Sequence, residues 1–148
     1  MTYEEKLAAV IETLTGAPGF MPAEDAYHGN YRIEDMTFPL VMCLPNGLGS
    51  IDIKTQVLRT ESISLFFSEL VDMDVAYKVK EDCYERMHLL AAEFLVKAGL
   101  SVHFFTPTDV TWDYFEKFDI NICGVVYSFK LKERSGLKVC DFEVTHEL

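Results

Sequence analysis

One long apolar stripe, with strand-like segments before and after it, constrains the fold of this chain more than any other feature. The stripe has the three- and four-residue spacing of one helix face and consists of Tyr84, Met87, Ala91, Phe94 and Ala98. We predict a helix over about 76–98, with Asp74 as its N-cap and Gly99 as its C-terminal stop. Because runs of strands flank this helix, the expected fold is α+β, an antiparallel or mixed β-sheet with helices packed on it.

A second, shorter helix is predicted near the start of the chain, over residues 3–15. Thr2 and Glu5 form a capping box, and Gly16 can end the helix. Its apolar face consists of Leu7, Val10, Ile11 and Leu14. Residues 16–36 are rich in glycine and proline, so they predict a long loop with at most short extended pieces. An arm that reaches a neighbour and a segment packed over the sheet explain such a loop equally well.

Alternation and turn residues predict three strands between the two helices. These strands cover residues 38–44, 51–57 and 62–68. The first is nearly all apolar and should be buried on both faces, whereas the second should be half-buried, with Ile51 and Ile53 facing inward. Pro45-Asn46-Gly47 has strong turn chemistry, so we expect a hairpin loop over 45–50 and an antiparallel meander.

Further strands are predicted after the long helix. The first contains an alternating run of Val110, Trp112 and Tyr114. The strongest pattern covers residues 119–132 and changes parity partway, since Ile122 falls on one side and Val125 on the other. A change of parity needs one extra residue, which predicts a β-bulge at Cys123-Gly124. The pattern ends with a turn at 135–136 and a strand over 137–144.

Composition indicates a single soluble domain that spans residues 1–148. Apolar residues make up 49% of the chain, and its formal net charge is −11. Phosphate groups need cations, so this charge disfavours nucleic-acid binding and an anionic membrane surface. No apolar run reaches the ~18 residues that cross a bilayer. The first ten residues lack a signal-peptide pattern, so we expect synthesis in a reducing cytoplasm. There four reduced, buried cysteines are expected, namely Cys43, Cys83, Cys123 and Cys140.

Motifs for catalysis or for metal binding are not found in the sequence. The histidines lack zinc-site spacing, and no serine lies in a nucleophile-elbow motif. A calcium loop opening at Asp72 fails at Tyr77 and Cys83, where glycine and a carboxylate are required. The glycine-rich stretch at 46–50 lies between strands, whereas a phosphate cradle needs a following helix. We therefore expect no enzyme, no catalytic residue, no cofactor and no metal.

Two groups of residues are candidates for an interface with another protein. The first is the loop tip formed by Asn46, Gly47 and Leu48, which can protrude and insert into a partner. The second is an aromatic cluster of Trp112, Tyr114 and Phe115. One strand face would point Trp112 and Tyr114 into the core and leave Phe115 exposed, as interface anchors are. Core packing alone and core packing combined with an interface both remain open for this cluster.

Two stretches of the second half carry a pattern that is similar to a known group. One runs from 61–67 through 86–95, and the other covers 117–131, followed by 136–140. The pattern F-D-x-N-x-x-G-V with a closing cysteine is matched by Phe118, Asp119, Asn121, Gly124, Val125 and Cys140. These stretches resemble small structural proteins of tailed phages of Bacteroidetes hosts, the crAss-like phages and their relatives. The order of elements also resembles that of tail-terminator and neck ring proteins.

The resemblance implies a function without catalysis. It implies a structural subunit of a phage neck or tail ring, which joins portal to tail and surrounds the DNA path. The implied partners are other copies in a closed ring of six- or twelve-fold symmetry, neighbouring portal, neck and tail proteins, and passing DNA without specific binding. An acidic inner wall would let DNA slide, since phosphates find no cations there. The implied location is the virion, and the alternative is a non-catalytic adaptor of another assembly.

Overall fold

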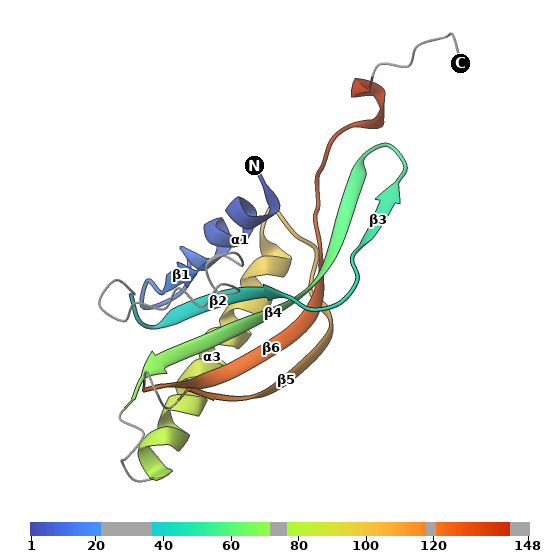
Figure 1. The fold of residues 1–148 in the computed structure, drawn as a ribbon. Helices are drawn as coiled ribbons and strands as arrows, with labels where there is room; N and C mark the ends of the chain where they lie inside the picture. Colours follow the sequence, from blue (N-terminus) through green and yellow to red (C-terminus); the bar gives the residue numbers. More distant parts are fainter. Residues whose placement is uncertain (22–36, 72–76, 118–120, 143–148) are drawn as a thin grey trace.

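The computed structural model describes residues 1–21, 37–71, 77–117 and 121–142. Figure 1 shows this part of the chain as a curved sheet with helices lying along it. The helices are α1 (Tyr3–Ile11) and α3 (Tyr77–Leu100), and a short 3-10 helix, η3, covers Val139–Asp141. The strands are β1 (Gly19–Met21), β2 (Leu40–Pro45), β3 (Ser50–Ile53), β4 (Val57–Leu70), β5 (Thr108–Lys117) and β6 (Ile122–Lys132).

The strands form one mixed sheet, which confirms the predicted α+β class. The sheet order is β1-β2-β4-β6-β5, and β3 also pairs with β4. β1 is parallel to β2, whereas the other neighbours are antiparallel. The second half of β4 pairs with β2 and its first half pairs with β3. The predicted meander is therefore wrong, because β2 and β3 lie end to end along the same edge of β4.

The first helix begins as predicted and ends earlier. The side-chain oxygen of Thr2 accepts a hydrogen bond of 3.1 Å from the backbone N–H of Glu5, which caps α1. The helix ends at Ile11, and a turn carries the chain on to Gly16, which has a positive φ of 87°. Leu14 lies in that turn and is still buried, so the apolar face extends beyond the helix itself.

The long helix has its apolar stripe where the sequence predicts it. Its buried residues include Tyr84, Met87, Leu90, Ala91, Phe94 and Ala98. The predicted stop at Gly99 is wrong, because α3 continues through Leu100. A Cβ atom on Gly99 would lie 2.6 Å from the hydroxyl of Thr106, so glycine is needed there for close packing. The proposed N-cap, Asp74, lies outside the described residues.

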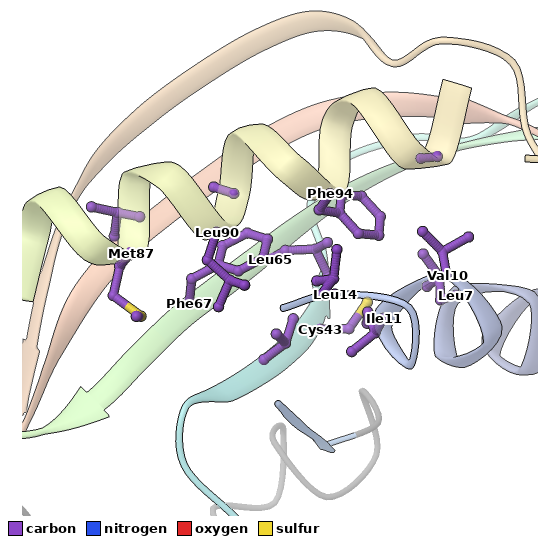
Figure 2. Packing of buried hydrophobic residues seen from close by; sticks show 14 of the residues in the cluster. Leu7, Val10, Ile11, Leu14, Cys43, Leu65, Phe67, Met87, Leu90 and Phe94 are labelled. Carbon is purple, nitrogen blue, oxygen red and sulfur yellow. The ribbon is translucent and has the colours of Figure 1, made fainter. Parts of the chain in front are cut away.

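The core lies between the helices and one face of the sheet. Figure 2 shows α1 and α3 placing their apolar side chains against Cys43 on β2 and Leu65 and Phe67 on β4. Phe67 and Phe94 are fully buried, and their ring centroids are 6.2 Å apart. A Cβ atom on Gly124 of β6 would lie 1.8 Å from the carbonyl oxygen of Phe67, so the two strands approach too closely there for any side chain.

A smaller cluster lies on the opposite face of the sheet. It is formed by Met21, Leu40 and Met42, with Phe38, Leu44, Phe66 and Phe115 packed against it. On β2, Leu40 and Met42 face this cluster while Val41 and Cys43 face the helices. The prediction that the strand at 38–44 is buried on both faces is thus confirmed for β2. Within the predicted loop over 16–36, Gly19–Met21 forms β1, and the rest from residue 22 lies outside the described residues.

The predicted bulge at Cys123-Gly124 is wrong. β6 pairs with β4 in unbroken register from Thr60↔Lys132 to Leu70↔Ile122. The parity change arises because Ile122 is buried on one face and Val125 on the other, so both sheet faces are covered there. The irregularity lies in β5 instead, between Thr108 and Thr111, where Asp109 has a φ of +54°.

The predicted strand over 137–144 is also wrong. Lys138 makes only an isolated bridge to Gln56, after which Val139–Asp141 turns as η3, and residues from 143 lie outside the described part. This difference decides the state of the cysteines. All four are free thiols, but Cys140 is exposed because no strand carries it into the sheet, while Cys43, Cys83 and Cys123 are buried as predicted.

Candidate functional site

A projecting arm is the first candidate surface, and we define it as residues 50–60 and 133–142. Its centre is the start of β4, which pairs with β3 from Ser50↔Thr60 to Ile53↔Val57. On the other side, the backbone N–H of Val57 donates to the carbonyl of Leu137 at 2.8 Å, and that of Val139 donates to Thr55 at 2.9 Å. Figure 1 shows the arm extending past the helices, with the chain's last described residues beyond its tip.

The arm exposes the apolar residues that its alternation would place in a core. Ile51 is 58% exposed, Ile53 is 62% exposed and Leu137 is 64% exposed. The prediction that Ile51 and Ile53 face inward is therefore wrong. The strand periodicity is real, but the helices cover only the body of the sheet and leave the arm without a second layer.

The predicted loop tip lies at the base of the arm and is a bulge. Pro45 pairs with Ile63 and Ser50 pairs with Thr60, so residues 46–49 lie opposite residues 61–62. The backbone N–H of Asn46 donates to the carbonyl of Ser62 at 2.8 Å, and the hydroxyl of Ser62 donates to the carbonyl of Leu48 at 3.0 Å. The hairpin loop predicted over 45–50 is thus wrong, because the chain reverses at 54–56.

Exposure of the predicted tip residues is nevertheless high. Leu48 is 92% exposed, and Asn46 and Gly47 are also exposed. Gly47 has a φ of +104°, a conformation that side chains rarely adopt, so glycine fixes the shape of this bulge. The structure places all three beside the arm.

A cluster of charges around the buried carboxylate of Glu133 fixes the root of the arm to α1. The ammonium of Lys6 lies 2.5 Å from one carboxylate oxygen of Glu133, and the Nε of Arg59 lies 2.9 Å from the other. Lys6 also donates to the carbonyl of Ser135 at 2.9 Å. Burial alone raises the pKa of Glu133, but hydrogen bonds from Arg59 and Lys6 outweigh it and hold the pKa of this carboxyl below its usual range.

The ring of Tyr3 completes the root. Its hydroxyl donates to the carbonyl of Leu131 at 2.7 Å, and the guanidinium of Arg59 lies 5.4 Å from the centre of its ring. Burial raises the pKa of Tyr3, which keeps its hydroxyl a donor. The arm therefore projects from a polar clamp that joins both ends of the described chain, and its direction is set by these contacts.

A hollow of about 750 Å³ lies between the arm and the body. Its rim is apolar, with Ile51, Val102 and Leu137, and its base holds the charged groups of Lys6, Arg59 and Glu133. These charges are already paired with one another, so the hollow presents an apolar rim more than a set of free polar groups. That chemistry suits contact with another protein surface.

The aromatic edge is the second candidate surface, and we define it as Trp112 and Tyr114 of β5 with Tyr84 and His88 of α3. Trp112 is 49% exposed and Tyr114 is 53% exposed. The ring of His88 meets that of Trp112 edge-on at 4.4 Å, and its Nδ1 lies 2.7 Å from the hydroxyl of Tyr127. The rings of Tyr84 and Tyr114 are 4.6 Å apart.

Trp112 and Tyr114 are only half covered because just one flank of α3 reaches them. Phe94 of the stripe packs on β4 and β6, whereas Tyr84, at the start of the stripe, and His88 beside it contact β5. The hydroxyl of Tyr84 also donates to the carboxylate of Glu116, which fixes this flank against the strand. Trp112 and Tyr114 are thus partly packed and partly exposed, and an interface at this cluster stays a prediction.

Phe115 lies on the strand face opposite Trp112 and Tyr114, as predicted, but it is partly covered there. It points to the opposite face of the sheet, where its ring contacts that of Phe66 at 5.0 Å in an edge-on arrangement. The prediction that Phe115 is exposed is therefore wrong, because the second apolar cluster covers it partly. The structure thus separates the six predicted interface residues into three beside the arm, two on the aromatic edge and one in a cluster.

The two candidate surfaces lie along opposite edges of the sheet. β3 pairs with one side of β4, and β5 pairs with the far side of β6. Within the described residues, the outer edges of β3 and β5 have no strand partner. The sequence missed the contributions of Ile51, Ile53 and Leu137. The sequence feature that could have identified Ile51 and Ile53 is their alternation with polar residues, in a chain whose two predicted helices are too few to cover every strand.

Among the described residues, no group of three histidine, cysteine or acidic side chains is placed to hold a metal ion. None of the described helices combines the length and apolar character needed to cross a membrane. No protein-family model matches the chain, and a search of curated proteins likewise finds no match.

Proposed function

We propose that this chain is a structural subunit that assembles with copies of itself into a closed ring, within the neck or tail of a tailed phage. The observation that carries the proposal is the arm. Ile51, Ile53 and Leu137 are each more than half exposed on an element whose root is fixed by the ion pairs of Glu133. An ordered, projecting apolar element is stabilised when another protein covers it.

Two different surfaces support a ring more than a two-fold dimer. A two-fold contact uses one self-complementary patch, whereas a ring joins two complementary patches on different sides of each subunit. The arm and the aromatic edge lie on opposite sides of the sheet and differ in shape and chemistry. We infer that the arm of one copy docks on the aromatic edge of the next, and that the ring closes with six- or twelve-fold symmetry.

Charge supports this pairing as well. The arm carries the cations Lys54, Arg59, Arg134 and Lys138 against the anions Asp52, Glu133 and Asp141, a net charge of +1. β5 carries Asp109, Asp113 and Glu116 against Lys117, a net charge of −2. The whole chain has a net charge of −11, so the arm differs in sign from the chain as a whole. Opposite potentials favour docking of arm on edge over docking of arm on arm.

Backbone pairing and aromatic contact then supply the affinity. The open edge of β3 can add to the open edge of β5 as an extra strand, which satisfies backbone groups on both. Trp112 and Tyr114 are the residue types that most often anchor protein interfaces. Ile51 and Ile53 would cover the exposed halves of these rings.

The position of the ring in the particle follows from the resemblance. We propose that the ring joins portal to tail and surrounds the DNA path, and that acidic residues on its inner wall let DNA pass without binding. Leu89, Val96 and Leu100, exposed on the outer side of α3, are the residues that we assign to the neighbouring portal, neck or tail proteins.

A non-catalytic adaptor is the second candidate. The half-exposed Trp112 and Tyr114 favour it, because one aromatic patch is enough to bind a single partner. An adaptor has no reason to bind a second copy of itself. Self-assembly therefore distinguishes the two functions.

Cryo-electron microscopy of particles from the source, with this chain assigned to density, tests the proposed location. The expected result is a closed ring around the DNA path with the arm at each subunit contact. A chain absent from every particle would overturn the phage assignment. Acidic side chains on the outer wall alone would overturn the sliding role.

Mixing two defective variants tests the arm-on-edge contact independently of any particle. The arm variant is Ile51→Ser with Ile53→Ser, and the edge variant is Trp112→Ser with Tyr114→Ser. The arm variant keeps an intact aromatic edge and the edge variant keeps an intact arm, so neither should self-associate alone. An equimolar mixture should form a heterodimer and nothing larger in native mass spectrometry. Leu89→Ser with Val96→Ser is the matched control and should assemble like the unmodified chain. A mixture that stays monomeric while the unmodified chain assembles would contradict this pairing.

A further inference from the structure

Two of the buried cysteines form a pair that the proposed function does not use. Cys83 lies in the second turn of α3 and Cys123 lies near the start of β6. Their sulfur atoms are 2.9 Å apart, and both residues are fully buried. The thiol of Cys83 also donates to the carbonyl of Cys123 at 3.3 Å. The two thiols are therefore held facing each other between the helix and the sheet.

We propose that Cys83 and Cys123 form an oxidation site, at which peroxide converts the dithiol into a disulfide that joins α3 to β6. The sulfur atoms need to approach by only about 0.9 Å to reach the bonded distance of ~2.05 Å. Both are free thiols in the structure, as a reducing cytoplasm would keep them. The proposal does not depend on the ring.

The chemistry balances with hydrogen peroxide as the oxidant. The thiolate of one cysteine attacks one peroxide oxygen, the O–O bond breaks, and a sulfenic acid and water form. The second sulfur then attacks the first and displaces the sulfenic oxygen as water. Two thiols and one peroxide thus become one disulfide and two waters, and an external thiol reverses the change.

The surroundings favour this pair over the other buried thiol. The hydrogen bond between the two thiols holds the pKa of Cys123 below that of an ordinary thiol, which makes Cys123 the better nucleophile. The same hydrogen bond and burial raise the pKa of Cys83. Cys43 has a pKa raised to about 12 by burial and is packed against the first helix, away from this pair.

A disulfide here would stabilise the body of the protein only outside a reducing environment. It would close a loop between residues that are 40 positions apart and fix α3 on the sheet. For a domain of this size, closing such a loop should raise the Tm by about 5–10 °C. The chain would therefore fold and assemble without the bond and be stabilised after exposure to oxidant.

The test uses the full chain with Cys140→Ser, which removes the exposed thiol and with it cross-links between molecules. The protein is treated with hydrogen peroxide, denatured, alkylated and analysed by peptide mass spectrometry. We expect loss of two hydrogen masses in a linked pair of peptides that contain Cys83 and Cys123, with Cys43 still alkylated. We also expect the Tm to rise and to return after treatment with dithiothreitol.

Cys83→Ala and Cys43→Ala are the paired controls. The first should abolish the linked peptides and the thermal shift, and the second should preserve both. Full alkylation of all three thiols after peroxide treatment would overturn the proposal. Oxidation of Cys83 or Cys123 to a sulfinic acid without linked peptides would overturn it too. Because the linkage is mapped in a chain that keeps both cysteines, the result does not depend on whether the alanine variants fold.

Discussion

The body and the arm of this protein use the same strand pattern with opposite results. In the body, alternating residues such as Leu65, Phe67 and Val125 are fully buried under the two helices. In the arm, the alternating residues Ile51 and Ile53 are more than half exposed. The difference teaches that alternation reports two strand faces, whereas burial depends on whether a second layer reaches the strand. The apolar residues of the body are covered within one chain, whereas those of the arm stay exposed to solvent.

The two regions are also held by different forces. Apolar packing between helix and sheet holds the body, with Phe67 against Phe94 at its centre. Paired charges hold the root of the arm, where Glu133 joins Lys6 to Arg59. Packing is insensitive to pH, while a carboxylate clamp depends on ionisation. Substitutions in the two regions should therefore differ in size and in pH dependence.

The largest loss of stability should follow from creating a cavity in the core of the body. Phe94→Ala removes a fully buried ring and should lower the free energy of unfolding by about 4 kcal/mol. Val96→Ala, two positions further along the same helix, is the matched control and should change it by less than about 0.5 kcal/mol, since Val96 is exposed. Urea unfolding measures both. Equal losses in the two variants would contradict the assignment of the core.

A matched pair of glycine substitutions compares the regions directly. A Cβ atom would lie 1.8 Å from a backbone oxygen at Gly124 and 1.9 Å from one at Gly136. Gly124→Ala should cost about 3 kcal/mol, because the central strands cannot separate. Gly136→Ala should cost much less, because the segment beside β4 can move away locally. If urea unfolding gave Gly136→Ala the larger loss, the arm would be the better-packed region.

Loss of the charge clamp should have an intermediate and pH-dependent effect. Glu133→Gln leaves Lys6 buried without its anion and should cost about 2 kcal/mol at pH 7, which is less than for a fully buried pair because Arg59 is half exposed. The pKa of Glu133 is lowered by folding, so its contribution is present above about pH 4.5 and is lost as the pH falls through the folded value. Unfolding free energies of both proteins between pH 3 and pH 7 should converge at the acid end. A constant difference across this range would exclude the ionised clamp.

The smallest effect on stability should come from the arm's apolar residues. Ile51→Ser and Ile53→Ser should each change the unfolding free energy of the dilute monomer by less than about 0.5 kcal/mol, because both side chains are exposed. The same changes should reduce self-association strongly, as measured by sedimentation at high concentration. A large loss of monomer stability would mean that these residues pack within their own chain.

The sequence predicts the body well because its signals are local. The spacing from Tyr84 to Ala98 determines the long helix, and the side chain of Thr2 caps the first one as expected. The turn chemistry of Pro45-Asn46-Gly47 misplaced the hairpin, because glycine at positive φ serves a bulge as well as a turn. The parity change near Ile122 suggested an extra residue. The prediction failed because a sheet that is covered on both faces gives the same pattern.

The candidate site is predicted less well because it depends on distant contacts. Trp112, Tyr114 and Leu48 can be selected by residue type alone. About half of the Trp112 and Tyr114 side chains and nearly all of Leu48 are exposed. Nothing local links Lys6 to Glu133, or Val57 to Leu137, so the clamp and the arm are visible only in three dimensions. Whether Ile51 faces a helix or solvent is likewise decided by where α3 ends.

The clamp at the root of the arm also determines which contacts can form late during synthesis of the chain. Lys6 and Glu133 are 127 positions apart, and the hydroxyl of Tyr3 bonds a carbonyl 128 positions away. These two polar contacts of α1 therefore form only after β6 has been made, whereas its apolar face can pack on α3 earlier. Contacts of such long range slow folding. A growing chain would accordingly leave the ammonium of Lys6 and the hydroxyl of Tyr3 without these partners until nearly all of the sheet has emerged.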